Sequence, residues 1–328
     1  MRTNKFLAVG LLATMILSSC SNNEDPANTP GTDEIQLNAG IGLQTRASEG
    51  VISPNYEQDL KVAFARYDAS TSTWSGTDLK AVRIGGSGQT PIAFDQTQSY
   101  DAANNKTTLI GYYPRPENTP VTPTGTDPVT ALYTIDGNTD IMATEVLSGS
   151  KNSLITSCTF THHLAQLQFR NVGSAEARTK WQNIAIKVKN VPTDLQLKIN
   201  KATNVAPALT VVSPSTTADL TVNGGSKVPQ SPDDANPTTG YVMLYPVANL
   251  GSSANALTVE VTGEYDNNPA TTKTVTIQNI AGGLEKGKSN LITLIFTVDG
   301  DISASATADI APWNPGNAGS SVVIPDYN

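Results

Sequence analysis

Apolar and polar residues alternate along most of this chain, and a period of two predicts β-strands. The clearest run covers residues 35–43, where Ile35, Leu37, Ala39, Ile41 and Leu43 share one side of the predicted strand. Similar runs follow at residues 60–64, 107–113, 131–135, 141–147, 160–170, 184–191, 195–199, 208–212, 218–222, 241–247, 257–263, 272–280, 291–298, 302–310 and 321–324.

Many short strands separated by Pro, Gly and Asn turns predict an all-β fold of antiparallel β-sandwiches. Only residues 175–181 have a helical pattern, for about two turns. The strands are roughly twice as many as one sandwich uses, which predicts two sandwich domains in tandem. The polar residues 148–150 suggest a boundary that gives domains at 34–153 and 154–328, and the strand that begins at Phe160 is expected to open the second domain.

The first twenty residues have the pattern of a bacterial lipoprotein signal. Arg2 and Lys5 precede an apolar stretch, and Leu17-Ser18-Ser19-Cys20 has the small residues and the thiol that lipoprotein processing requires. We therefore expect residues 1–19 to be removed, Cys20 to carry the lipid, and the polar residues 20–33 to form a tether. The alternative is an ordinary signal peptide in which Cys20 is incidental.

The net charge narrows the possible binding partners, and the cysteine content narrows the possible disulfides. The formal net charge is −8, and nucleic acids or anionic lipids would require a basic surface instead. With Cys20 acylated, Cys158 is the remaining thiol of two cysteines, so no intrachain disulfide is expected. Its place in an alternating run favours a buried structural cysteine over a nucleophile.

No known catalytic motif is present, and we predict neither an enzyme nor a bound cofactor. His162 and His163 are adjacent in a predicted strand, so their side chains should point to opposite faces and cannot share one metal ion. Residues 136–140 and 299–301 carry oxygen ligands that could bind Ca²⁺, but hairpin turns are the preferred interpretation. The tryptophans are too dispersed to predict a sugar-stacking platform, and they stand at Trp74, Trp181 and Trp313.

Two segments of the sequence have features that a β-sandwich fold alone does not require. Arg46, between small residues and before Ala47 and a glycine, is an accessible site for a trypsin-like protease, although from composition alone a solvent-facing arginine at a strand end is the better explanation. The C-terminal tail forms a second alternating run that could close its own sheet or pair with a neighbouring molecule. Its apolar positions are Ile302, Ala304, Ala306, Ala308 and Ile310, followed by Val322 and Ile324.

The order of several motifs resembles the fimbrillin family of Bacteroidetes pilus subunits. The matching pieces are the lipobox at Cys20, Thr45-Arg46-Ala47, Gly111-Tyr112-Tyr113-Pro114, Asp140-Ile141-Met142-Ala143, residues 160–169, Tyr241-Val242-Met243-Leu244-Tyr245-Pro246, residues 284–298 and residues 309–313.

The resemblance implies two transthyretin-like sandwiches and a surface subunit that polymerises. In this family an Arg-specific protease removes the first strand with its lipid, and a strand from the next subunit fills the gap. Here the cut would fall between Arg46 and Ala47, residues 35–43 would be displaced, and the donor would be the tail from about residue 302. Implied partners are other fimbrial subunits, the outer membrane, the protease and an adhesion ligand.

Alternatives remain open at this stage. A stalk subunit is favoured over an anchor, which keeps its lipid, or a tip subunit, which exchanges a strand at one end only. A glycan-binding surface lipoprotein would need an exposed aromatic cluster. A surface hydrolase would need converging carboxylates or a metal site, and no residue spacing predicts either.

Overall fold

The computed structural model describes residues 33–42, 52–75, 78–115, 129–201, 205–235, 237–280, 282–305 and 310–312. Within these residues the regular secondary structure is almost entirely β-strand, which confirms the all-β prediction. The helix predicted at 175–181 is present as α1 (Ala175–Lys180), and the Ser174 hydroxyl caps it by accepting a hydrogen bond from the Ala177 amide. No helix in the described ranges is long and apolar enough to cross a membrane.

The first half of the chain supplies a nine-stranded sheet. Its strands are β1 (Asn38–Ile41), β2 (Leu60–Asp68), β3 (Thr73–Trp74), β4 (Leu79–Arg83), β5 (Thr90–Phe94), β6 (Thr107–Tyr113), β8 (Met142–Ala143), β9 (Leu147–Gly149) and β10 (Ser157–His162).

Seven of these strands close into a barrel-like ring, which corrects the expected N-terminal sandwich. The order β2-β4-β5-β1-β10-β8-β6 returns to β2, because β2 pairs with β4 on one edge and with β6 on the other. A sandwich needs two separate sheets facing each other, whereas here a single sheet curls until its edges meet. Leu60, Val62 and Phe64 of β2 point into the core that the ring encloses.

A three-stranded sheet covers the outside of β2. It consists of β7 (Val129–Thr134), β13 (Asp194–Ile199) and β14 (Ala208–Val211), in the order β14-β13-β7. The small side chains of Ala63 and Ala65 form the outer face of β2 and share a hydrophobic cluster with Leu197 and Ile199 of β13. The middle of β2, residues 62–65, is therefore buried on both faces.

The second half of the chain forms two further sheets. One has the order β16-β17-β11-β20-β21 with β22 also paired to β20, and the other has the order β15-β12-β18-β19. Their strands are β11 (Ala165–Gly173), β12 (Trp181–Pro192), β15 (Thr217–Thr221), β16 (Asn223–Gly224), β17 (Gly240–Leu244), β18 (Ser252–Tyr265), β19 (Thr271–Asn279), β20 (Lys288–Phe296), β21 (Ile302–Ser305) and β22 (Ile310–Pro312).

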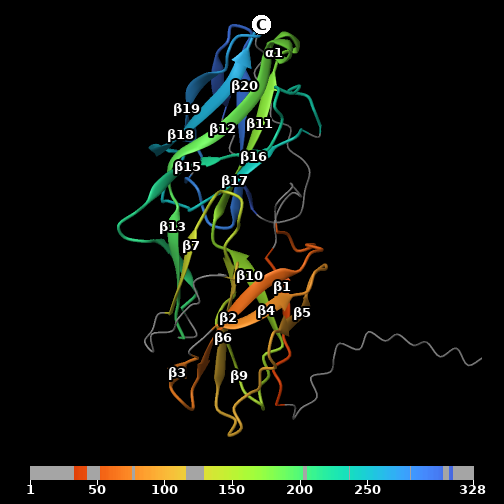
Figure 1. Cartoon of the computed structure of the whole chain (residues 1–328), viewed down its shortest axis with the longest axis vertical. Helices are drawn as coiled ribbons and strands as arrows, with labels where there is room; N and C mark the ends of the chain where they lie inside the picture. The colour runs from red at the N-terminus through yellow and green to blue at the C-terminus, as the bar shows by residue number, and fades with distance from the viewer. Residues whose placement is uncertain are drawn as a thin grey trace, which may run out of the picture.

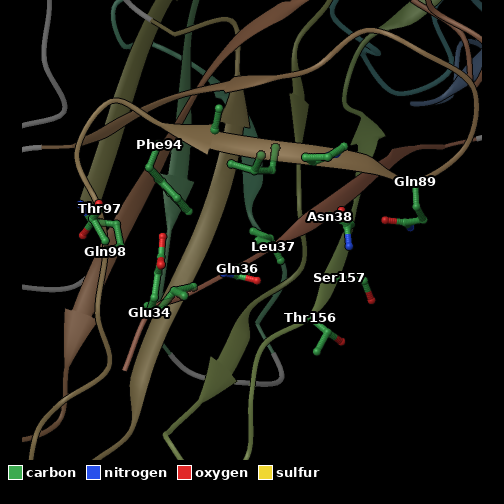
Figure 2. A pocket seen from close by; sticks show the side chains of 14 residues that line it. Glu34, Gln36, Leu37, Asn38, Gln89, Phe94, Thr97, Gln98, Thr156 and Ser157 are labelled. Atoms are coloured by element: carbon green, nitrogen blue, oxygen red, sulfur yellow. The ribbon is translucent and has the colours of Figure 1, made fainter. Parts of the chain in front are cut away.

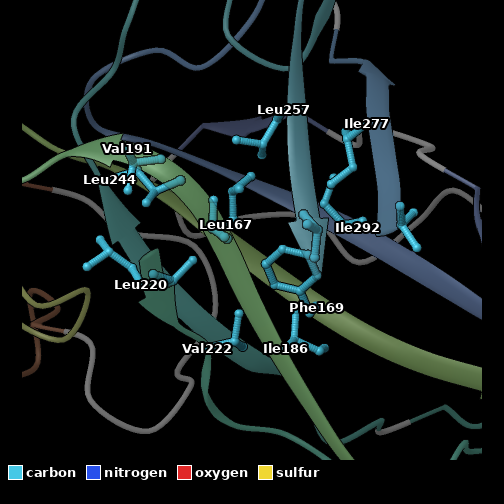
Figure 3. Close-up of a cluster of buried hydrophobic side chains, with 14 of the residues drawn as sticks. Leu167, Phe169, Ile186, Val191, Leu220, Val222, Leu244, Leu257, Ile277 and Ile292 are labelled. Atoms are coloured by element: carbon cyan, nitrogen blue, oxygen red, sulfur yellow. The ribbon is translucent and has the colours of Figure 1, made fainter. Parts of the chain in front are cut away.

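These two sheets share one large hydrophobic core. Figure 3 shows Leu167 and Phe169 of β11 and Ile292 of β20 packed with Leu257 of β18 and Ile277 of β19. Figure 1 shows an elongated molecule in which this pair of sheets occupies one end and the ring occupies the other, with β7 and β13 between them.

The strand predicted at residues 160–170 is divided between the two ends of the molecule. Residues up to His162 belong to β10, which pairs with β1 and β8, whereas Ala165 begins β11, which pairs with β17 and β20. The apolar positions change phase at this break, from even-numbered positions up to Leu164 to odd-numbered positions from Ala165 onward. The sequence therefore carries a sign of the break that a single predicted strand over residues 160–170 overlooks. A boundary after residue 153 would therefore separate β10 from both of its partner strands.

Candidate functional site

β1 occupies the place in the ring between β10 and β5. It pairs in parallel with β10 along all four of its residues but with β5 only at Asn38 and Ala39. Two further bonds extend the ladder with the β10 segment, since the Asn38 amide donates to the Thr156 carbonyl at 2.9 Å and the Gly42 amide to the Phe160 carbonyl at 2.7 Å. β1 is therefore held mainly from one side.

The apolar side chains of the leading segment complete the core of the ring. Ile35, Leu37, Ala39 and Ile41 are each at most 5% exposed and belong to the same cluster as Phe64 of β2. Burying a large aliphatic side chain contributes about 1.5–3 kcal/mol. The segment is thus a structural part of the ring although it lies at the edge of the described chain. Leu43, the fifth position of the predicted run, lies outside the described residues.

A groove separates the leading segment from β5 just before β1 begins. The Ile92 amide donates to the Leu37 carbonyl at 2.8 Å and the Ile35 amide to the Gln98 carbonyl at 2.7 Å, and between these bonds the two segments diverge. The groove has a volume of about 660 Å³, and Figure 2 shows Leu37 and Phe94 among its lining residues. This opening is a second sign that contact with β5 is incomplete.

A buried arginine contacts β1 from inside the ring. The guanidinium of Arg83, at the end of β4, is fully buried, and its Nε donates to the Ala39 carbonyl at 3.1 Å. Among the described residues its other acceptors are the carbonyls of Ile84, Gly86 and Gly88, and no carboxylate is paired with it. Burial lowers the pKa of Arg83.

Sequence reasoning missed Arg83, although a signal was present. The charged residue is followed, after Ile84, by the glycine-rich segment Gly85-Gly86-Ser87-Gly88. Glycines that bring several carbonyls to one point can satisfy a guanidinium without any acidic partner. Because Arg83 binds the backbone of β1, it belongs to the candidate site, although no sequence motif identifies it.

The described part of the C-terminal tail lies along β20. β21 pairs antiparallel with residues 293–296, and β22 pairs with residues 288–290. Ile302 and Ala304 are half-buried and pack against the core shared by the two C-terminal sheets. Ile310 is the first residue of β22. The other predicted tail positions lie outside the described residues, namely Ala306, Ala308, Val322 and Ile324.

The predicted processing residues Cys20, Arg46 and Ala47 also lie outside the described ranges.

Cys158 is buried in β10, as predicted, and burial raises the pKa of its thiol to about 12. Such a thiol is protonated at neutral pH and is a poor nucleophile.

Both histidines are buried where β10 ends. Nδ1 of His162 lies within hydrogen-bonding distance of an Asp140 carboxylate oxygen, and the other oxygen of Asp140 accepts from the Ile141 amide at 2.8 Å. Burial, followed by the charges of Lys286 and His162, lowers the pKa of His163 to about 4. No group of three His, Cys, Asp or Glu side chains suitable for a metal ion is found among the described residues.

In the two turns considered for Ca²⁺, side-chain oxygens accept hydrogen bonds from groups of the protein itself. An Asp136 carboxylate oxygen accepts from the amides of Asn138, at 2.8 Å, and Thr139, at 3.3 Å. Residues 299–301 connect β20 and β21, which pair from Phe296 opposite Ile302, so this turn closes a hairpin. Both arrangements agree with the preferred turn interpretation.

The two described tryptophans lie in separate clusters and form no joint platform. Trp74 packs with Tyr67 next to the ring, whereas Trp181 is fully buried against Tyr265 and Phe296 in the C-terminal core. Trp313 lies outside the described residues.

The fold and this site define an all-β protein in which an N-terminal strand completes the core of a ring. Residues 45–313 match the model of the fimbrillin-like family, so the chain belongs to that family. A search of curated proteins gives no match.

Two solved structures illustrate the fold. A putative cell adhesion protein from Bacteroides uniformis superimposes with a TM-score of 0.54 at 14% identity, covering 86% of this chain and 98% of its own. A putative cell adhesion protein from Parabacteroides distasonis gives a TM-score of 0.50 at 11% identity, covering 88% of this chain and 99% of its own. At these identities the similarity establishes the fold alone.

Proposed function

We propose that this protein is a structural subunit of a cell-surface fimbria that is exported as a lipoprotein and assembled by protease-triggered strand exchange. Membership of the fimbrillin-like family supports a structural rather than an enzymatic role. The lipid at Cys20 would hold the precursor at the outer membrane, and an Arg-specific protease would cut between Arg46 and Ala47. The assembled fibre would contribute to adhesion.

The observation that carries this proposal is the position of β1. Its side chains are buried in the ring, yet its pairing with β5 covers only two residues. Removal of residues up to Arg46 would open an apolar gap between β5 and β10 and leave backbone groups of both strands without partners. Such a gap strongly favours the insertion of a replacement strand.

The tail from about Ile302 is the proposed donor. Its alternating small apolar residues suit a buried strand position, and the side chains of Ile302 and Ala304 are only half-buried in their own subunit. Donation from the tail of one subunit to the ring of the next is a heterologous contact, and such contacts build open filaments rather than closed dimers.

We further propose that the protein has two domains, with the division between His162 and Ala165 rather than after residue 153. The change of sheet partners between β10 and β11 supports this position. The two facing sheets of the second half would form the transthyretin-like sandwich that the family resemblance implies.

Replacement of Arg46 tests the processing step. In the native host, wild-type protein should give protease-dependent ladders of polymers, whereas Arg46→Ala should remain lipidated and monomeric. Arg178→Ala is a matched control, because Arg178 is exposed on α1 and should not affect assembly. Equal polymerisation of Arg46→Ala and wild type would refute the cleavage model.

The N-terminus of the protein on intact cells distinguishes the alternative roles. A start at Ala47 identifies a processed subunit. A blocked, acylated Cys20 instead identifies an anchor subunit or a resident lipoprotein, including the glycan-binding class.

A further inference from the structure

The end of β4 and the loop that follows it contact β1 through the side chains of Arg83 and Gln89. Three of the four carbonyls bound by Arg83 come from residues 84–88, at distances of 3.0–3.3 Å. The fourth is Ala39 of β1. The guanidinium is thus oriented by its own loop, and one donor, Nε, points toward the backbone of β1.

The loop itself is fixed independently of β1. The Gly86 and Gly88 amides donate to the Tyr56 and Pro54 carbonyls, at 2.9 Å and 3.0 Å. A Cβ atom on Gly85 would lie 2.1 Å from the Glu57 carbonyl oxygen, so only glycine fits there. Since these contacts do not involve residues 38–41, they would keep Nε of Arg83 in place when β1 is absent.

The side chain of Gln89 covers β1 from the opposite, outer face. Its Nε2 donates to the Cys158 carbonyl of β10 at 3.2 Å, and this amide therefore crosses over the strand between them. A Cβ atom placed on Gly40 would lie 2.9 Å from the same Nε2. Glycine at position 40 is the residue that fits beneath Gln89 without moving it.

We propose that Arg83 and residues 84–89 form a register-setting surface for whichever strand occupies the place of β1. Arg83 binds one backbone carbonyl of that strand, and Gln89 covers the residue that follows where that residue is glycine. The first occupant is β1 itself, with Ala39 at the carbonyl position and Gly40 under the amide.

The second occupant is the tail of another copy of this chain, an assignment that rests on the proposed function. Residues 35–43 and 302–310 have the same alternation over the same length, each with alanine at its centre, Ala39 in one and Ala306 in the other. In that register the Ala306 carbonyl would bind Nε of Arg83. Thr307 would take the place of Gly40 and move the Gln89 side chain aside.

Hydrogen exchange on the intact, uncleaved full chain tests the surface without requiring strand exchange. Gln89→Ala should raise the exchange rate of the amides of residues 38–42 about fivefold, as expected for loss of one hydrogen bond. Arg83→Lys should raise it more, because lysine keeps the charge but has no Nε donor held toward Ala39 by further bonds to residues 84–88. Ser87→Ala is the matched control, because Ser87 lies in the same loop as Gln89 and its hydroxyl donates to Asn55, before β2, rather than to β1.

Gln89 is exposed, so its replacement leaves folding intact even if Arg83→Lys does not fold. Exchange rates in Gln89→Ala equal to those in Ser87→Ala would overturn the role of Gln89 as a cover. Unchanged rates in a folded Arg83→Lys variant would overturn the register-setting surface as a whole.

Cysteine crosslinking tests the second occupant. Cys158 stands opposite Ala39 in the register of β1 and β10, so a subunit carrying Ala306→Cys should form an intersubunit disulfide with Cys158 when assembled fibres are oxidised with copper phenanthroline. Ala304→Cys and Ala308→Cys should crosslink less. A preference for either of these would overturn the proposed register.

Failure of the wild-type chain to assemble would contradict the proposed function and the second occupant together. The exchange result on β1 is independent of assembly, so the two failures remain distinguishable.

Discussion

Ala39 of β1 and Cys158 of β10 stand opposite each other in a parallel strand pair, and both side chains are buried in the core of the ring. Neighbouring strands lie about 4.7–4.9 Å apart, within the Cα separation of about 4.4–6.8 Å that a disulfide bridges. The structure therefore offers a covalent lock for the strand whose removal is proposed to start assembly.

We expect Ala39→Cys to form an intrachain disulfide with Cys158 under oxidation. After cleavage at Arg46 the N-terminal fragment should then stay attached to the body on non-reducing gels, and assembly should be blocked until a reductant is added. Ala39→Ser, treated identically, should assemble normally. Assembly of the locked chain at the wild-type rate would show that β1 need not leave.

Leu37→Ala should destabilise the precursor by about 2–5 kcal/mol, the usual cost of a buried leucine truncation. Leu37 is 3% exposed in the ring core, whereas the neighbouring Gln36 is exposed, so Gln36→Ala should change the free energy of unfolding by less than about 0.5 kcal/mol. Chemical denaturation of the uncleaved protein measures both values. Equal effects would mean that the leading segment is not part of the cooperative core.

His163 should make the folded state sensitive to mild acid. Its folded-state pKa of about 4 lies below the ordinary value of 6.5, so the unfolded chain binds this proton first as the pH falls. The contribution of His163 is intact above pH 6.5 and is lost between about pH 6.5 and 4, by about 3 kcal/mol in all. In His163→Gln the pH dependence of the unfolding free energy should be correspondingly shallower across this window.

Removal of the tail should abolish strand donation by a subunit while leaving its ring able to accept a donor strand. A chain that ends at Ser305 should fold, be cut at Arg46 and remain monomeric, because it has a vacant ring but no complete donor strand. Mixed with wild-type subunits, it should accept one donor tail and end the growing filament, so polymer length should fall as its proportion rises. Ladders of wild-type length from the truncated chain alone would exclude the tail as donor.

The alternation of residues along the chain was enough to predict the all-β fold and the buried side of the leading segment. Ile35, Leu37, Ala39 and Ile41 are buried as their period of two requires. The closure of the ring could not be predicted in this way, because it depends on the pairing of β1 with β10, over one hundred residues later in the chain. Local patterns carry no information about such partners.

The burial of Arg83 is a second feature that the alternation of apolar and polar residues does not predict. A lone charged residue in an alternating strand is normally solvent-facing, since burying an unpaired charge is costly. Here four carbonyls, three of them gathered by a glycine-rich loop, replace the water. That compensation depends on the three-dimensional course of residues 84–88 and has no signature in hydrophobic periodicity.

The β7–β13 pairing has a mechanical consequence for a protein proposed to form a surface fibre. β7 is inserted between two ring strands in the sequence, yet its six residues pair antiparallel with β13, which follows directly on β12 of the opposite end. Both strands run along the long axis in Figure 1, so tension between the two ends would shear this ladder and strain its hydrogen bonds together rather than one after another. A fibre built from such subunits would resist stretching at the middle of every repeat.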